Sequence, residues 1–85
     1  MMNREDRAYD FFLHEHDDKL SQTENCLRYL ELYGEITPLE ALTAFGCFRL
    51  SAVIFNLRND GYDIDTKINE GKKKYAIYTL KGEEE

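Results

Sequence analysis

The sequence is poor in the residues that mark several large classes of protein. Its 85 residues contain no tryptophan, one proline and two cysteines. Two cysteines cannot build a disulfide framework, and no Cys-X-X-Cys pair signals a structural zinc site. No apolar run is long enough to span a bilayer, and no signal-peptide pattern stands at the start. We therefore expect one small cytoplasmic domain that makes no membrane contact and has Cys26 and Cys47 as buried free thiols.

Residues with a catalytic or metal-binding arrangement are also missing. There is no Ser–His or Cys–His pair with an orienting acid, no glycine-rich phosphate loop and no pair of carboxylates beside a cleft. His14 and His16 could hold a metal with Asp17 or Asp18, but side chains two apart do not face one way on a helix. A solvated acidic segment is the better interpretation. We expect no enzyme activity, no metal and no cofactor.

Positive charge is scarce and unevenly placed. Eleven Lys and Arg stand against 17 Asp and Glu, and the net charge of −6 argues against non-specific attraction to DNA. Only residues 61–82 are cationic, with five lysines against three acids. Lysines near a hairpin tip are placed to meet phosphates, although a solubilising turn is the alternative.

The strongest pattern in the chain runs from Ile36 to Tyr62 and predicts a helix-turn-helix. Thr37 is placed to cap the first helix, with Pro38 at its first position and Glu40 completing a capping box. Gly46 suits the sharp turn that follows. The apolar stripe of this first helix is expected to consist of Leu39, Ala41 and Leu42.

The second helix is expected over about 48–60. Apolar residues recur in it at i, i+3, i+4 and i+7, the period of one buried helix face. These residues are Leu50, Val53, Ile54 and Leu57. A short helix, a glycine turn and a longer helix with an apolar inner face form a helix-turn-helix signature.

The flanking segments predict the rest of an α+β winged helix-turn-helix fold. A helix is expected from Ser21, which forms a capping box with Glu24, to Gly34, with Leu27, Leu30 and either Tyr33 or Cys26 inside. Period-two alternation over 62–68 and 74–80 predicts a hairpin joined through 69–71, with Gly71 at positive φ. Its buried face is expected to carry Ile64, Ala76, Tyr78 and Leu80. Residues 35–37 are expected to be an extended link that can form a single strand bridge.

These segments divide the chain into three parts. A three-helix core with a two-stranded C-terminal wing is expected over residues 21–81. Residues 1–20 are expected to form a short N-terminal arm, either helical or loosely ordered, and residues 82–85 a disordered acidic tail. Tyr9, Phe11 and Phe12 in the arm are the expected contacts of a homodimer.

The outer face of the second helix is the expected partner-binding surface. Arg49 could read a guanine, Asn56 an adenine, and Ser51 could bind a phosphate. Two phenyl rings on the same face, Phe48 and Phe55, favour protein contact instead. The full set of expected DNA contacts is Thr37, Arg49, Ser51, Asn56, Arg58, Lys67, Lys72, Lys73 and Lys74.

The segment GEITPLEALTAFGCFRLSAVIFNLRNDGYDIDT closely resembles small winged helix-turn-helix proteins of bacteriophages and prophages. The shared positions are Ile36-Thr37, Glu40-Ala41-Leu42, Phe45-Gly46-Cys47, Arg49-Leu50, Ile54, Leu57-Arg58, Gly61-Tyr62, Ile64, Tyr78 and Leu80. The resemblance covers about residues 21–81 and implies a phage or prophage origin, a bacterial host cell and a regulatory or accessory DNA-binding role. The chain departs from the pattern at Phe48 and Val53, where members tend to carry polar or basic residues, and near Asn59, where a lysine is common.

Two functions remain open at this level. The first is binding of double-stranded DNA, with the second helix in the major groove and the lysine-rich wing on the phosphate backbone. The second is binding and inhibition of a host protein or defence complex through Phe48 and Phe55, which the acidic composition favours.

Overall fold

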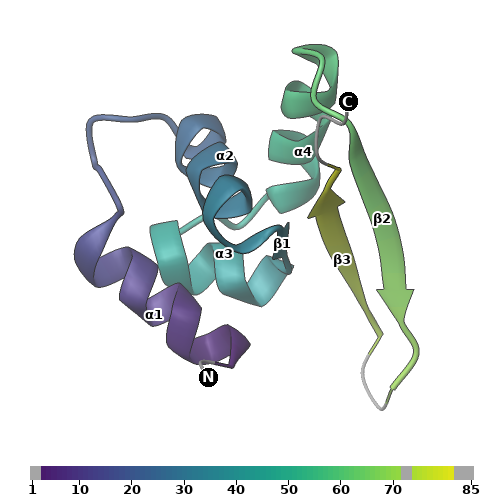
Figure 1. Cartoon of the computed structure of the whole chain (residues 1–85), viewed down its shortest axis with the longest axis horizontal. Coiled ribbons are helices and arrows are strands. Elements are labelled where there is room, and N and C mark those ends of the chain that lie inside the picture. The colour runs from purple at the N-terminus through teal and green to yellow at the C-terminus, as the bar shows by residue number, and fades with distance from the viewer. Residues whose placement is uncertain (1–2, 72–73, 82–85) are drawn as a thin grey trace.

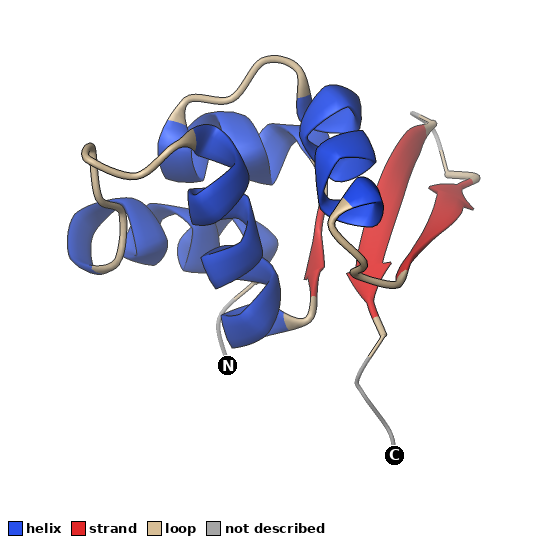
Figure 2. Ribbon diagram, turned by 90° about the horizontal axis from the view of Figure 1, so that it is seen from above, coloured by secondary structure: helices blue, strands red, loops and turns tan. Residues whose placement is uncertain are grey.

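The computed structural model describes residues 3–71 and 74–81 and contains four helices and a three-stranded antiparallel sheet. The helices pack together on one side, and the hairpin of the last two strands extends beside them (Figures 1 and 2). The two-residue strand lies at the helical side and pairs with the last strand, so the strand order is β1-β3-β2. In chain order the elements are α1 (Arg4–His14), α2 (Gln22–Tyr33), β1 (Glu35–Ile36), α3 (Pro38–Phe45), α4 (Leu50–Asn59), β2 (Ile64–Asn69) and β3 (Tyr75–Leu80).

The ends of α2 and α3 are set by local side-chain chemistry, as the sequence predicts. Both N-termini carry complete capping boxes, Ser21 with Glu24 and Thr37 with Glu40. Each box satisfies two backbone N–H groups that the helix itself cannot bond. Gly34 closes α2 in the left-handed region at φ 85°, where a side chain would be strained.

The N-terminal segment is a helix that belongs to the core, which resolves the choice between a helix and a loose arm. Asn3 caps α1 by accepting from the N–H of Asp6, and α1 packs against α3. Ala8 and Phe11 are fully buried, and the Phe11 ring meets Tyr29 edge-on at 5.1 Å between centroids. The expected three-helix core is therefore a four-helix core. Phe11 cannot form part of a self-association surface, because its ring is enclosed by the domain itself.

The inner face of α4 agrees with the prediction and that of α3 does not. Leu50, Val53, Ile54 and Leu57 are all buried. In α3, however, Leu39 and Leu42 are 59% and 40% exposed, and the buried stripe is formed by Glu40, Ala41, Ala44 and Phe45. The stripe has the helical period, but a carboxylate occupies one of its positions and the two leucines fall beside it.

The sheet has the expected pairing with small changes at its ends. β1 joins β3 through Glu35 opposite Thr79, and β2 pairs with β3 from Ile64 opposite Leu80 to Asn69 opposite Tyr75. On the inner face Ile64 is buried, Tyr78 and Leu80 pack against the core, and Ala76 is half-buried. The expected positive φ at Gly71 is wrong. Instead, the Asn69 side chain accepts from the N–H of Gly71 at 2.8 Å, a local bond that shapes the turn.

Both cysteines are free and buried, as expected. Burial raises the pKa of the Cys26 thiol to about 12, and the nearby Cys47 adds to this. Cys26 therefore packs as a small apolar side chain and does not act as a nucleophile.

In the described part of the chain, no single helix has the length and apolar character needed to cross a membrane. Taken together, α3 and α4 meet that criterion by length and composition, but the two helices are bent by 93° at the break between them.

Candidate nucleic-acid interface

The helix-turn-helix is formed by α3, a short turn and α4. Gly46 ends α3 at φ 69°, and its N–H bonds to the Leu42 carbonyl at 3.0 Å while the N–H of Cys47 bonds to Ala41 at 3.2 Å. The 93° bend between the helices is typical of this motif. The second helix starts at Leu50, two residues later than the expected start at 48.

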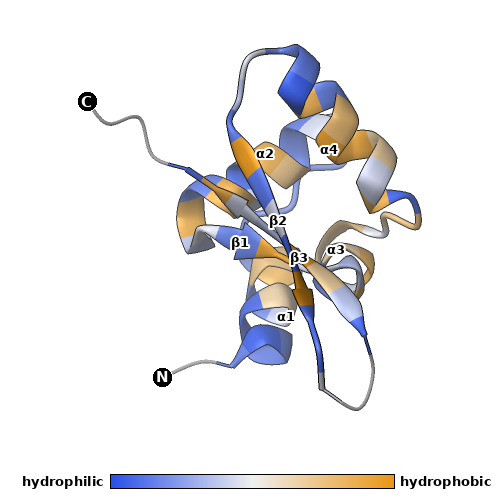
Figure 3. Ribbon diagram, turned by 90° about the vertical axis from the view of Figure 1, so that its right-hand side faces the viewer, coloured by the Kyte–Doolittle hydropathy of each residue, from blue (hydrophilic) through white to orange (hydrophobic). Residues whose placement is uncertain are grey.

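The outward face of α4 and the two residues just before the helix bring together five of the residues that the sequence singles out. Arg49, Ser51 and Asn56 are exposed, and so are Phe48 and Phe55, at 84% and 62%. Figure 3 shows that apolar residues occupy much of the α4 ribbon although only one face of the helix is buried. Arg49 stands at the N-cap position without a side-chain cap bond, unlike the cap residues of α1, α2 and α3. The surface therefore combines one cation, short polar groups and two phenyl rings.

Arg58, at the C-terminal end of α4, forms hydrogen bonds to β2. Its Nη2 donates to the Ile64 carbonyl at 2.6 Å and to Thr66 Oγ1 at 2.8 Å, and its Nε donates to the same carbonyl at 3.1 Å. These bonds tie the C-terminal end of α4 to the start of β2. Arg58 thus fixes the wing relative to α4, and only its remaining donors can reach a phosphate.

The wing lysines are spread over different places. Lys67 and Lys74 are exposed, whereas Lys72 and Lys73 lie outside the described residues. Because side chains alternate across a strand, Lys67 projects from the face opposite to Ile64 and Thr66. Arg58 joins α4 to the face of the wing that carries Thr66. Lys67 therefore projects from the face of the wing opposite to the one that α4 contacts.

Thr37 is a correction among the expected contacts. Its side chain is 4% exposed and its Oγ1 accepts from the N–H of Glu40 at 3.3 Å. The helix cap uses this hydroxyl, so the Thr37 side chain is not offered to DNA.

At the N-terminal end of α3 lies a charged cluster, centred on the buried Glu40, that sequence reasoning did not find. Glu40 is 3% exposed, and its Oε2 accepts from Tyr29 Oη at 2.5 Å and from Arg7 Nε at 2.8 Å. Its Oε1 accepts from the Thr37 N–H at 3.0 Å and from Arg4 Nη1 at 3.3 Å. Arg4 also pairs with Glu35 at 2.6 Å, so the cluster joins α1, α2, β1 and α3.

The cluster changes the acid–base behaviour of its members. Burial raises the pKa of the Tyr29 hydroxyl, and the bond to the Glu40 carboxylate raises it further. Burial alone would lower the pKa of Arg7, but the hydrogen bond and the charge of Glu40 outweigh it and the pKa rises. Tyr29 therefore stays a neutral donor between a carboxylate and a guanidinium. The sequence signal for the burial of Tyr29 is the spacing of Cys26, Tyr29, Leu30 and Tyr33 along one helix face.

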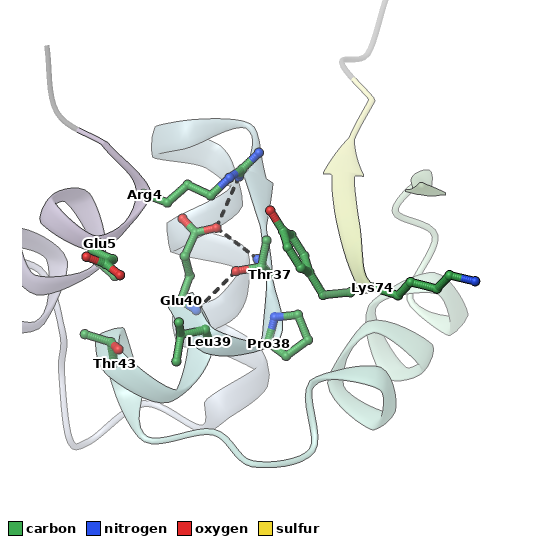
Figure 4. Close-up of a pocket in the computed structure, with 10 residues that line it drawn as sticks. Arg4, Glu5, Thr37, Pro38, Leu39, Glu40, Thr43 and Lys74 are labelled. Atoms are coloured by element: carbon green, nitrogen blue, oxygen red, sulfur yellow. Dashed lines mark hydrogen bonds and ion pairs between the residues drawn. The ribbon is translucent and has the colours of Figure 1, made fainter. Parts of the chain in front are cut away.

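An apolar groove of about 440 Å³ opens beside this cluster, between α1, α3 and the start of β3. Figure 4 shows Arg4, Glu40 and Thr37 linked along its wall, while Lys74 points away from it. Both carboxylate oxygens of Glu40 already have partners. The groove is lined by Arg4, Glu5, Ala8, Thr37, Pro38, Leu39, Glu40, Thr43, Lys74 and Tyr75.

The histidines and aromatic side chains of the N-terminal region lie apart from α4. His16 stacks on Phe12 at 5.6 Å between ring centroids and pairs with Asp18 at 3.4 Å. Within residues 3–71 and 74–81, no three side chains of His, Cys, Asp or Glu are grouped so that they could hold a metal. Tyr9 and Phe12 are 59% and 49% exposed, and the expected homodimer contact through them stays a prediction.

Comparisons with known proteins agree with this architecture. A family model described as a winged helix-turn-helix domain matches residues 21–83. No curated protein and no solved structure matches the chain. The fold is typically a DNA-binding, non-enzymatic one, and it suggests DNA as a partner. The matched residues span most of the chain and include α2 to β3, so the protein belongs to the winged helix-turn-helix family.

Proposed function

We propose that the protein binds double-stranded DNA, with α4 in the major groove. The observation that carries this proposal is the division of α4 into two faces. Four buried aliphatic side chains hold its inner face to the core, so Arg49, Ser51 and Asn56 are presented outward on a rigid helix. The resemblance to phage and prophage proteins supports a narrower role as a regulatory or accessory protein in the cytoplasm of a bacterial host.

The residue types on α4 suit specific roles in the groove. Arg49 can donate two hydrogen bonds to guanine, and Asn56 can donate to and accept from adenine. Ser51, in the first turn of α4, can donate to a phosphate. Lys67 and Lys74, with Lys72 and Lys73 outside the described residues, would contact phosphates beyond the groove that α4 occupies.

Few cations and a net charge of −6 set the expected strength of binding. Non-specific affinity depends on the number of phosphates that a protein neutralises, so we expect it to be weak and strongly reduced by salt. The non-specific affinity is lowered further by three acidic residues near the junction of α4 and the wing, Asp60, Asp63 and Asp65. Specificity must then come mainly from the contacts that α4 makes with base edges.

Replacing Arg49 with alanine should weaken binding to a duplex about tenfold and reduce the dependence of log K on log salt by about one unit. The reason is the loss of one charge-assisted contact at the start of α4. The measurement is fluorescence anisotropy of a labelled 30-base-pair duplex from a phage regulatory region, at several salt concentrations.

Arg28→Ala provides the matched control. Arg28 lies on α2, where its Nη2 donates to the Glu15 carbonyl at 3.1 Å, so this variant changes the net charge equally without touching α4. We expect it to bind like the unaltered protein. Equal losses for Arg28→Ala and Arg49→Ala would show a general charge effect, and no saturable binding by the unaltered protein would refute the proposal.

The exposure of Phe48 and Phe55 favours a second candidate, binding and inhibition of a host protein or defence complex. In this case a stoichiometric partner should be captured from nuclease-treated bacterial lysate. The partner should be lost with Phe55→Ala and retained with Arg49→Ala, because the phenyl ring would form the contact. A partner retained by both variants would place the interaction elsewhere, and the same partner lost only with Arg49→Ala would contradict this candidate.

A further inference from the structure

Phe48 and Phe55 occupy an unusual position for large apolar side chains. Phe55 is 62% exposed on the outward face of α4, which also carries Ser51 and Asn56. Phe48 is 84% exposed in the turn just before α4, next to Arg49. Burial of such a ring is worth about 1.5–3 kcal/mol, so leaving two of them in water forgoes a large part of the stabilisation available to a small domain. A binding partner that covers them would recover it.

The surroundings of the two rings limit the kind of partner. The exposed residues between them in the chain are Arg49, Ser51 and Ala52, of which the last two are small. Two phenyl rings contribute about 300–500 Å² of contact area, whereas a stable protein interface covers about 800 Å² on each partner. The apolar patch is therefore narrow, with the start of α4 between the two rings. This shape suits a groove better than a flat protein surface.

The chemistry of the major groove offers one apolar partner among the four unmodified bases. Guanine, cytosine and adenine present hydrogen-bonding groups there, which a phenyl ring would desolvate without replacing. Thymine adds a C5-methyl group, and Phe is among the side chains that contact it. A phenyl ring held in the groove thus favours a position with thymine over any other unmodified base.

We propose that Phe48 and Phe55 contact thymine methyl groups, so that the DNA bound by α4 is rich in A·T pairs at the positions facing these rings. This inference rests on the proposed function, since it requires α4 to lie in the major groove. Arg49 supplies the phosphate or guanine contact beside them.

Two DNA polymers that differ in this methyl group alone test the inference. Poly(dA-dT) and poly(dA-dU) have the same hydrogen-bonding groups, and uracil lacks the C5-methyl. Competition for a labelled duplex in low salt should give about four- to sixteenfold weaker binding of poly(dA-dU), because each of the one or two buried methyl groups contributes about a fourfold factor. The double variant Phe48→Ala/Phe55→Ala should bind both polymers weakly and equally.

Leu32→Ala is the matched control. Leu32 is 53% exposed on α2, so its removal also deletes an exposed apolar side chain but leaves α4 intact. This variant should keep the preference for poly(dA-dT). Circular dichroism and thermal melting should show all variants folded, since exposed substitutions of this kind change stability by about 0.5 kcal/mol or less.

The remaining outcomes separate this inference from the proposed function. Equal binding of both polymers by the unaltered protein, or binding of mixed-sequence duplex with neither A·T polymer bound, would overturn the inference and leave DNA binding standing. A preference for poly(dA-dT) that survives the double variant would overturn it as well. No binding to any duplex would overturn both and assign the two rings to a protein partner.

Discussion

Replacing Glu40 with alanine should lower the free energy of unfolding by about 3–5 kcal/mol, a large part of the stability of a small domain. The substitution removes the acceptor shared by Tyr29, Arg7 and Arg4. The Arg7 guanidinium, whose side chain is 16% exposed, then keeps Glu35 at 3.4 Å as its carboxylate partner. It also opens the capping box of α3. Urea unfolding followed by far-ultraviolet circular dichroism measures the change.

Glu24→Ala is the control that distinguishes the stability lost with the charged cluster from the stability lost with the capping box. Glu24 occupies the same position in the capping box of α2 as Glu40 does in that of α3, but its side chain is exposed. Loss of an exposed cap costs about 1 kcal/mol. If the two variants were destabilised equally, the buried ion pairs would contribute nothing beyond the cap. Glu40→Gln keeps the size of the side chain and removes its charge, so it should fall between them.

Helix ends and the inner face of α4 could be predicted from the sequence because local residues determine them. A capping box involves residues three apart, and Gly34 and Gly46 act on the turn in which they stand. The apolar spacing of α4 is regular enough that one face must be inside. Such features do not depend on where the rest of the chain lies.

The face of α3 and the placement of α1 could not be predicted in the same way. Leu39 and Leu42 are the more apolar residues, but α1 packs over the stripe that contains Glu40 and Ala41. A carboxylate is buried there only because Arg7, which precedes it by 33 positions, supplies a charged donor. Long-range pairing of this kind leaves no trace in the local hydrophobic pattern.

The candidate site shows the same contrast. The outward direction of Arg49, Ser51 and Asn56 follows from the inward direction of the aliphatic residues on the same helix. Arg58 bonds to β2 because β2 approaches the end of α4. The Thr37 hydroxyl is occupied because it completes the cap of α3. Residue type predicted both as DNA contacts, and only the three-dimensional arrangement shows that the Thr37 hydroxyl and the Nε and Nη2 groups of Arg58 bond within the fold.

Replacing Phe11 with alanine should destabilise the protein by about 3–5 kcal/mol, whereas Phe12→Ala should change the free energy of unfolding by less than about 1 kcal/mol. Phe11 is fully buried and its ring centroid lies 5.1 Å from that of Tyr29 and 6.1 Å from that of Phe45. Removing it leaves a cavity between α1, α2 and α3 and loses both aromatic contacts. Chemical unfolding of both variants measures the difference.

Neighbouring positions make this comparison a direct test of how α1 belongs to the domain. Both residues are phenylalanines in the same helix, so helix propensity changes equally in the two variants. Phe12 is 49% exposed and stacks on His16. If α1 were an arm resting loosely on an independent domain, Phe11→Ala would release the helix without a change in the main unfolding transition. A single cooperative transition shifted to much lower denaturant, with Phe12→Ala unshifted, requires α1 to fold together with the helix-turn-helix that presents α4.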